Sequence, residues 1–133
     1  LIGIAKQIEG DLRLAQQMAI SGEKPPGSYP TGCDNRVLDS VRFGISKTSP
    51  FNYKIRAVCG YDATDNYPII KTYVFPDGFS YNVSTFAPNP IQFKVLGQGT
   101  NIPSSSSGVL TISDVFDNFE TNTIDSGGTL TLR

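Results

Sequence analysis

The chain has 133 residues, a length typical of one domain with a sizeable hydrophobic core. Its 11 basic and 12 acidic side chains leave a net charge of -1, so charge provides no general attraction to nucleic acid or to an anionic membrane surface. Ser, Thr, Asn and Gly are abundant, His and Trp are absent, and no stretch of 18 apolar residues occurs. This composition indicates a polar, β-rich, extracytoplasmic domain.

Residues 1–21 carry apolar side chains at steps of three and four. These are Leu1, Ile4, Ile8, Leu12, Ala15 and Ala19. The spacing places them on one face of an amphipathic α-helix, while the charged and amide side chains, Asp11 among them, fall largely elsewhere. The helix is predicted to end at Ser21-Gly22, because Gly adopts the left-handed conformation that ends helices. We expect the helix to pack on the rest of the chain through Ile8, Leu12, Ala15 and Ala19.

From residue 36 onward the hydrophobic pattern changes to a period of two. Seven short stretches are predicted as strands: 41–46, 53–59, 68–75, 79–84, 91–97, 109–113 and 129–133. The first two are expected to pair as an antiparallel hairpin, whereas 114–128 is less regular and is assigned no strand. The predicted fold is therefore α+β. A long N-terminal amphipathic helix (1–21) packs on antiparallel β-sheet of about seven short strands (36–133), in one domain, 1–133.

Two cysteines bear on the redox environment. Cys33 lies in a loop rich in Gly and Pro, and Cys59 ends a predicted strand. A cysteine pair in a chain without histidine is explained most simply by one disulfide, and two buried, reduced cysteines are the alternative. A bridge would close a loop of about 25 residues and stabilise the fold by roughly 3 kcal/mol. A structural zinc site, which needs four ligands, is not supported.

The sequence offers little for catalysis. Without histidine there is no Ser-His or Cys-His nucleophile pair. Carboxylates gather in two predicted loops, as Asp62 with Asp65 and as Asp114, Asp117 and Glu120. Either set has the oxygen ligands that calcium prefers, but neither has EF-hand spacing, and solvated turn carboxylates are the preferred interpretation. We therefore predict no enzyme activity, no cofactor and no metal site.

The order of several motifs resembles that of a known family. The helix motif DLRLAQQMAIS leads to the Gly-containing strand VRFGIS and then to YKIRAVC. Further on, FPDGFSYNVS precedes IQFKVLGQGT, a Ser-rich gap, GVLTIS and a terminal strand. The arrangement is similar to the soluble part of type IV pilin-like proteins, closest to the minor pilins and minor pseudopilins of the GspH/FimT type. In that family the strand matching IQFKVLGQG carries an aromatic residue and a final Gly, as Phe93 and Gly97 do here.

The resemblance implies a structural function. The chain would be a minor subunit of a type IV pilus or of a type II secretion pseudopilus, with other pilin or pseudopilin subunits as partners. In the family a hydrophobic N-terminal helix anchors the subunit in the inner membrane before it packs into a periplasmic pseudopilus or a cell-surface pilus. Residues 1–20 would then continue that helix. We expect roughly 20 to 30 mostly apolar residues upstream, preceded by a short basic leader.

Interpretations from other functional classes stay open. A secreted β-rich module that binds carbohydrate or protein would have a secretory signal or another domain upstream instead. An enzyme would need carboxylates converging in a cleft. Some FimT-type minor pilins are DNA receptors, but Arg133 is the only basic residue after Lys94, so the sequence argues against DNA binding.

Overall fold

The structure, a computed structural model, describes residues 2–46, 51–78, 80–83, 91–95, 99–102, 107–113, 119–125 and 127–132. One helix precedes the strands: α1 (Ile2–Ser21), β1 (Ser40–Ser46), β2 (Asn52–Val58), β3 (Ile69–Val74), β4 (Ser80–Val83), β5 (Ile91–Lys94), β6 (Ser107–Ser113), β7 (Phe119–Asp125) and β8 (Leu130–Leu132). Gly97 and the carboxylates Asp114 and Asp117, which the sequence analysis singled out, lie outside the described residues.

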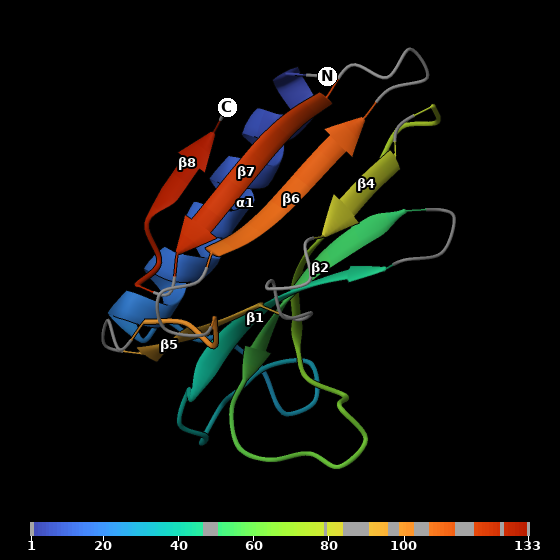
Figure 1. The fold of residues 1–133 in the computed structure, drawn as a ribbon. Coiled ribbons are helices and arrows are strands. Elements are labelled where there is room, and N and C mark those ends of the chain that lie inside the picture. Colours follow the sequence, from blue (N-terminus) through green and yellow to red (C-terminus); the bar gives the residue numbers. More distant parts are fainter. Residues whose placement is uncertain are drawn as a thin grey trace.

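The described strands form two antiparallel sheets of four strands each (Figure 1). The first sheet has the order β3-β2-β1-β5, and the second sheet has the order β4-β6-β7-β8. The expected hairpin of β1 and β2 is present, with Phe43 opposite Ile55. An α+β fold with an N-terminal helix on antiparallel sheet is thus confirmed, but eight strands in two sheets are described instead of about seven.

Strand β7 lies in the segment to which the sequence pattern assigned no strand. It pairs with β6 on one side and with β8 on the other, so it is central to the second sheet. Among its described side chains, Asn122 and Ile124 are buried, at 2% and 0% exposed. Because the polar residues Glu120 and Asn122 share the face of Ile124, the hydrophobic alternation that identifies half-buried strands is missing here.

Helix α1 ends where the sequence predicted. The amide of Gly22 donates to the carbonyl of Ala19 at 3.3 Å, and the amide of Glu23 donates to the carbonyl of Met18 at 3.1 Å. Gly22 has a φ of 70°, a conformation that favours glycine. The two bonds and this conformation define a Schellman cap, which satisfies carbonyl groups at the end of the helix.

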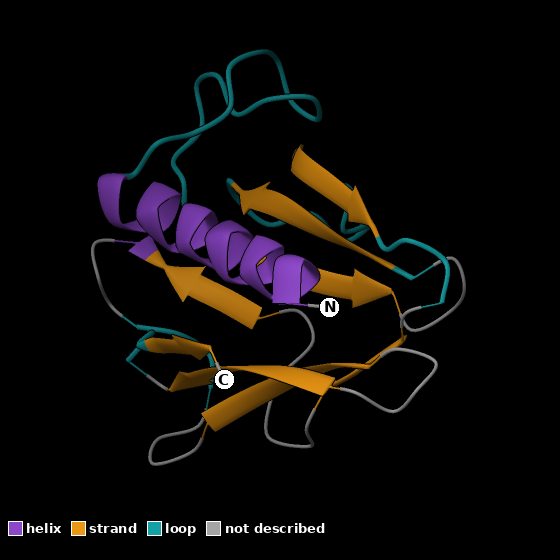
Figure 2. Ribbon diagram, turned by 90° about the horizontal axis from the view of Figure 1, so that it is seen from above, coloured by secondary structure: helices purple, strands orange, loops and turns teal. Residues whose placement is uncertain are grey.

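The helix packs on both sheets through one face (Figure 2). It contacts β1 and β5 of the first sheet and β7 and β8 of the second. The four side chains named for this packing are Ile8, Leu12, Ala15 and Ala19, which are at most 1% exposed. They belong to one core cluster with Phe43, Ile55 and Phe93. The helix is therefore the element on which both sheets are assembled.

Candidate functional site

The buried face of α1 carries a carboxylate. Asp11 is 3% exposed and accepts hydrogen bonds from the hydroxyl of Tyr53, from Nε2 of Gln7 at 2.9 Å and from Nζ of Lys71 at 2.7 Å. Asp11 was expected to lie away from the apolar face of the helix, and this prediction is wrong. Its spacing contained the signal, since residue 11 lies three positions after Ile8 and shares its face.

Three donors make the burial of Asp11 tolerable, because a buried charge is costly unless it is paired and hydrogen-bonded. Lys71 provides the opposite charge from the edge strand β3. Burial raises the pKa of Tyr53 far above its usual range, and the hydrogen bond to Asp11 raises it further. Tyr53 also stacks on Phe43, with ring centroids 4.6 Å apart, and on Tyr73, at 5.3 Å. This network fixes the position of the helix along the first sheet.

The contact of α1 with the second sheet includes two side-chain amides. Nδ2 of the buried Asn122 in β7 donates to the backbone carbonyl of Ala5 at 3.1 Å. Nε2 of Gln16 donates to the carbonyl of Gly128 at 2.8 Å. A Cβ atom at residue 128 would lie 2.5 Å from that nitrogen, and φ there is 95°, so the contact requires glycine. These bonds tie the middle of β7 and the turn between β7 and β8 to the helix.

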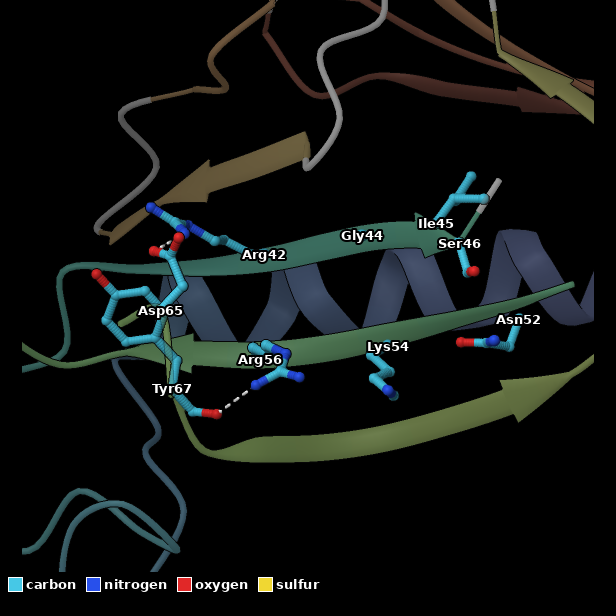
Figure 3. A pocket seen from close by; sticks show the side chains of 9 residues that line it. All are labelled: Arg42, Gly44, Ile45, Ser46, Asn52, Lys54, Arg56, Asp65 and Tyr67. Atoms are coloured by element: carbon cyan, nitrogen blue, oxygen red, sulfur yellow. Dashed lines mark hydrogen bonds and ion pairs between the residues drawn. The ribbon is translucent and has the colours of Figure 1, made fainter. Parts of the chain in front are cut away.

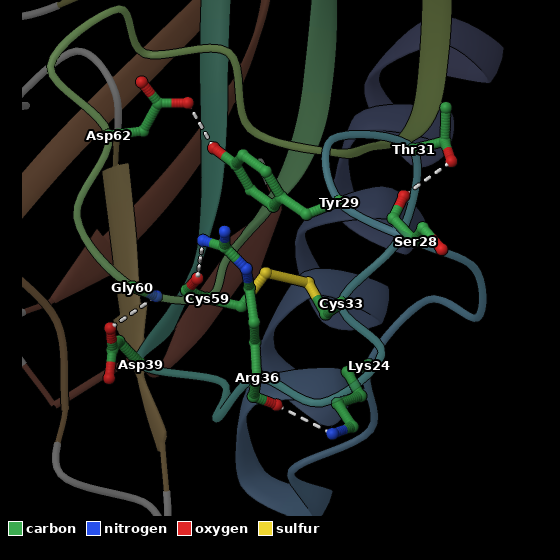
Figure 4. The surroundings of a disulfide bond; sticks show 10 residues. All are labelled: Lys24, Ser28, Tyr29, Thr31, Cys33, Arg36, Asp39, Cys59, Gly60 and Asp62. Carbon is green, nitrogen blue, oxygen red and sulfur yellow. Dashed lines mark hydrogen bonds between the residues drawn. A yellow bond between two sulfur atoms is a disulfide. The ribbon is translucent and has the colours of Figure 1, made fainter.

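A disulfide connects the loop after the helix to the first sheet (Figure 4). Cys33 and Cys59 are bonded, with their Cα atoms 6.0 Å apart, as the sequence predicted. Both side chains are fully buried, so they also contribute to the core. The alternative of two reduced cysteines does not describe the structure. The loop is thereby held beside the end of β2.

Polar and aromatic contacts surround the disulfide. The guanidinium of Arg36 lies 3.8 Å from the centroid of the Tyr29 ring, and its Nη1 donates to the carbonyl of Cys59 at 3.4 Å. Nζ of Lys24 donates to the carbonyl of Arg36 at 2.7 Å. The Tyr29 hydroxyl donates to the carboxylate of Asp62, so the loop reaches across to the segment before β3 (Figure 4).

Asp62 and Asp65 do not converge on a common point. Oδ1 of Asp62 accepts hydrogen bonds from Oγ1 of Thr64 at 2.7 Å and from the backbone amide of Thr64 at 2.9 Å. These bonds and the one from Tyr29 lower the pKa of Asp62 to about 2. Partial burial and the neighbouring Asp62 raise the pKa of Tyr29 to about 12. Asp65 instead pairs with Arg42 at 3.6 Å. Asp62 is thus a structural carboxylate within the loop contact, not merely a solvated one.

No described group of three or more Cys, Asp and Glu residues has a metal-binding arrangement. The described part of the chain also has no helix long and apolar enough to cross a membrane. No protein-family model, curated protein or solved structure matches the chain. What the protein does is therefore inferred from the arrangement of its own residues.

Proposed function

We propose that the protein is a minor structural subunit of a type IV pilus or of a type II secretion pseudopilus. The observation that supports this most is the position of α1, which has one face buried by both sheets and the opposite face open. On the open side, Leu14 and Ile20 are 38% and 45% exposed. A filament subunit needs a helix of this kind, which holds its own β-sheets on one side and meets other subunits on the other.

The open face of α1 also suits contact with another helix. A Cβ atom at Gly3 or at Gly10 would meet nothing within 4 Å. Residues 3, 10 and 14 follow each other at steps of seven and four, so they share one face. Two glycines and an exposed Leu on one face allow close approach of a second helix, and the approach would bury the apolar surface. The proposed partners are other pilin or pseudopilin subunits, with an upstream segment as the anchor in the inner membrane.

The disulfide fits the proposed location. Disulfides persist in oxidising compartments such as the bacterial periplasm and the cell surface. The bond between Cys33 and Cys59 holds the loop after the helix against the first sheet, and Asp11 holds the helix itself against that sheet. A rigid connection between helix and sheets keeps the β-rich part at a fixed position in a filament.

The gene context and a deletion strain test the proposal. The full gene should encode an apolar segment of roughly 20 to 30 residues upstream, long enough to span a bilayer, after a short basic leader. Deletion should impair pilus-dependent behaviour or secretion. A conventional cleavable signal peptide ending just before residue 1, or normal filament function without the gene, would contradict the proposal. Either result would favour a secreted β-rich module that binds carbohydrate or protein.

Complementation of the deletion strain tests the open helix face itself. Leu14→Glu should leave the fold intact, because the side chain is already 38% exposed, but should block filament function by placing a charge in the contact. Val37→Glu is the matched control, since Val37 is 79% exposed in the loop after the helix. Full complementation by Leu14→Glu would show that this face makes no contact in a filament.

A further inference from the structure

The first sheet has a cationic pocket on the side away from α1 (Figure 3). The pocket is open and has a volume of about 410 Å³. Arg42 comes from β1, Lys54 and Arg56 come from β2, and Asp65 and Tyr67 come from the loop before β3. Three cationic side chains and one carboxylate give the lining an excess of two positive charges, although the whole chain carries -1.

The strand register concentrates this charge. Arg42 lies directly opposite Arg56 across the antiparallel pair, and Lys54 lies opposite Gly44. Like charges opposite each other on neighbouring strands are destabilising. Gly44 has no side chain to cover the space beside Lys54. The arrangement therefore gathers three cations around an open space where a neutralising side chain would be expected.

The two arginines are held in place by groups that leave most of their charge uncompensated. The guanidinium of Arg42 lies 4.9 Å from the centroid of the Tyr67 ring. With its amide oxygen turned towards Arg42, Gln92 accepts from Nε at 2.9 Å and from Nη2 at 3.1 Å. Nη1 of Arg56 donates to the backbone carbonyl of Tyr67 at 2.9 Å. A ring, an amide and a carbonyl orient both guanidinium groups, and none of these partners is an anion.

Lys54 and Asp65 complete the site. Within the described part of the chain, Nζ of Lys54 has neither an ion-pair partner nor a hydrogen-bond partner. Asp65 is the one carboxylate in the lining, and its contact with Arg42 is long, at 3.6 Å, with a side chain that is 76% exposed. Exposed pairs of this kind are weak, so an incoming anion can displace Asp65 from Arg42.

We propose that this pocket binds a small anion with two or more negative charges, carried by phosphate or carboxylate groups. Oriented guanidinium groups bind both kinds of oxyanion through charge-assisted hydrogen bonds, and a lysine adds a point charge. A small ligand fits better than a polyanionic chain, because the cations lie within one pocket of limited volume. The site is independent of the filament proposal, since it lies on the sheet face away from the helix.

Titration of the folded chain with inorganic phosphate and, separately, with citrate tests the proposal. Backbone amide chemical shifts should change in a saturable way at Gly44, Lys54 and Arg56, and the tighter of the two probes identifies the preferred oxyanion. Lys54→Gln should weaken binding about tenfold, the loss expected for one charge-assisted bond. Asp65→Asn should instead strengthen binding, because it removes the competing carboxylate.

Two matched variants control for general charge effects. Lys6→Gln removes a cation from an exposed position of α1, and Glu23→Gln removes an exposed carboxylate after the helix. Neither should change the affinity measurably. Equal losses of affinity in Lys6→Gln and Lys54→Gln would overturn the proposal. Unchanged amide chemical shifts at about 10 mM of either anion would overturn it as well. Tight binding of single-stranded DNA with neither small anion bound would assign the face to a polyanion instead.

Discussion

The two sheets attach to the same helix by different chemistry. The first sheet presents an aromatic and aliphatic surface, with Tyr53 and Phe43 stacked against each other, and a partly buried ion pair joins Asp11 to Lys71. The second sheet contributes the apolar Ile124 but also a buried Asn122, which bonds to the helix backbone. Among the described side chains, the first sheet contributes Phe43, Tyr53 and Ile55 to the core, whereas the second contributes Ile124 and the hydrogen-bonded Asn122. We therefore expect the second sheet to open at a lower free energy than the first.

The largest expected effect is on the helix face that packs into the core shared by both sheets. Leu12 is fully buried in the core cluster, so Leu12→Ala removes apolar contacts and leaves a cavity. The free energy of unfolding should fall by about 2–5 kcal/mol in urea denaturation. The exposed Leu14→Ala is the matched control on the same helix. A loss under about 0.5 kcal/mol for Leu12→Ala would place that face of the helix in solvent.

Removal of the disulfide should have the next largest effect. Cys33→Ala with Cys59→Ala should lower the free energy of unfolding by about 3 kcal/mol, because the unfolded chain loses its cross-link. Hydrogen exchange should then increase mainly in the loop 22–39 and at the end of β2, with β7 and β8 nearly unchanged. Intact-mass measurement with and without reduction checks the bond directly. Free thiols in protein prepared under oxidising conditions would contradict the structure.

The second attachment includes one fully buried side-chain amide, that of Asn122. Asn122→Ala removes a hydrogen bond to the carbonyl of Ala5, which keeps its partner within the helix, and should cost about 0.5–1.5 kcal/mol. The more informative result is which strands lose protection from amide hydrogen exchange. Amide exchange should increase in β7 and β8 but not in β1 and β2. Uniform loss of protection in both sheets would show that the two attachments open together.

The smallest effect concerns the polar contact beside the disulfide. The pKa of Asp62 is about 2, below its usual value of 3.8, so its contribution to stability is present above about pH 4 and is lost as the pH falls towards 2. The stability that Tyr29 contributes is lost in alkali instead of in acid. Its pKa of about 12 means that its contribution is lost as the pH rises from about 10 to 12.

Unfolding curves between pH 2 and 5 check the acid branch. The unmodified protein should lose stability across this window, and Asp62→Asn should lose less. The exposed Asp34→Asn is the control and should follow the unmodified protein. Ultraviolet titration should show that Asp62→Asn lowers the pKa of Tyr29 only in part, because burial is the larger cause of its shift. An unchanged pKa of Tyr29 would remove Asp62 as a cause.

The features found from sequence were those marked by hydrophobic periodicity or by glycine. The end of α1 follows from Gly22, and the pairing of β1 with β2 follows from the alternation around Phe43 and Ile55. Polar residues at inward positions were missed because they interrupt that pattern. Asn122 concealed β7, and Asp11 was assigned to the wrong face of the helix. The disulfide was predicted because the chain has only two cysteines.

The cationic pocket depends on the register between β1 and β2. Hydrophobic alternation alone does not identify such a pocket. Once β1 and β2 pair with Phe43 opposite Ile55, Arg42 must lie opposite Arg56. The sequence therefore contained this juxtaposition. The contributions of Gln92 and Tyr67 were not accessible in the same way, because both come from segments outside the hairpin and reach Arg42 only in the folded chain.

The central claim is that α1 packs on its own sheets with one face and contacts other subunits with the opposite face. Cross-linking in the organism that carries the gene tests this claim most directly. The full-length protein carries Leu14→Cys or, as a control, Val37→Cys, and a thiol-specific reagent with a photoactivatable group is attached to that cysteine in intact filaments before illumination. With the proposed function, covalent links should form from position 14 to another filament subunit, and they should be lost in a strain without the assembly ATPase. No link from position 14 in cells that assemble filaments, or links that persist without the ATPase, would contradict it.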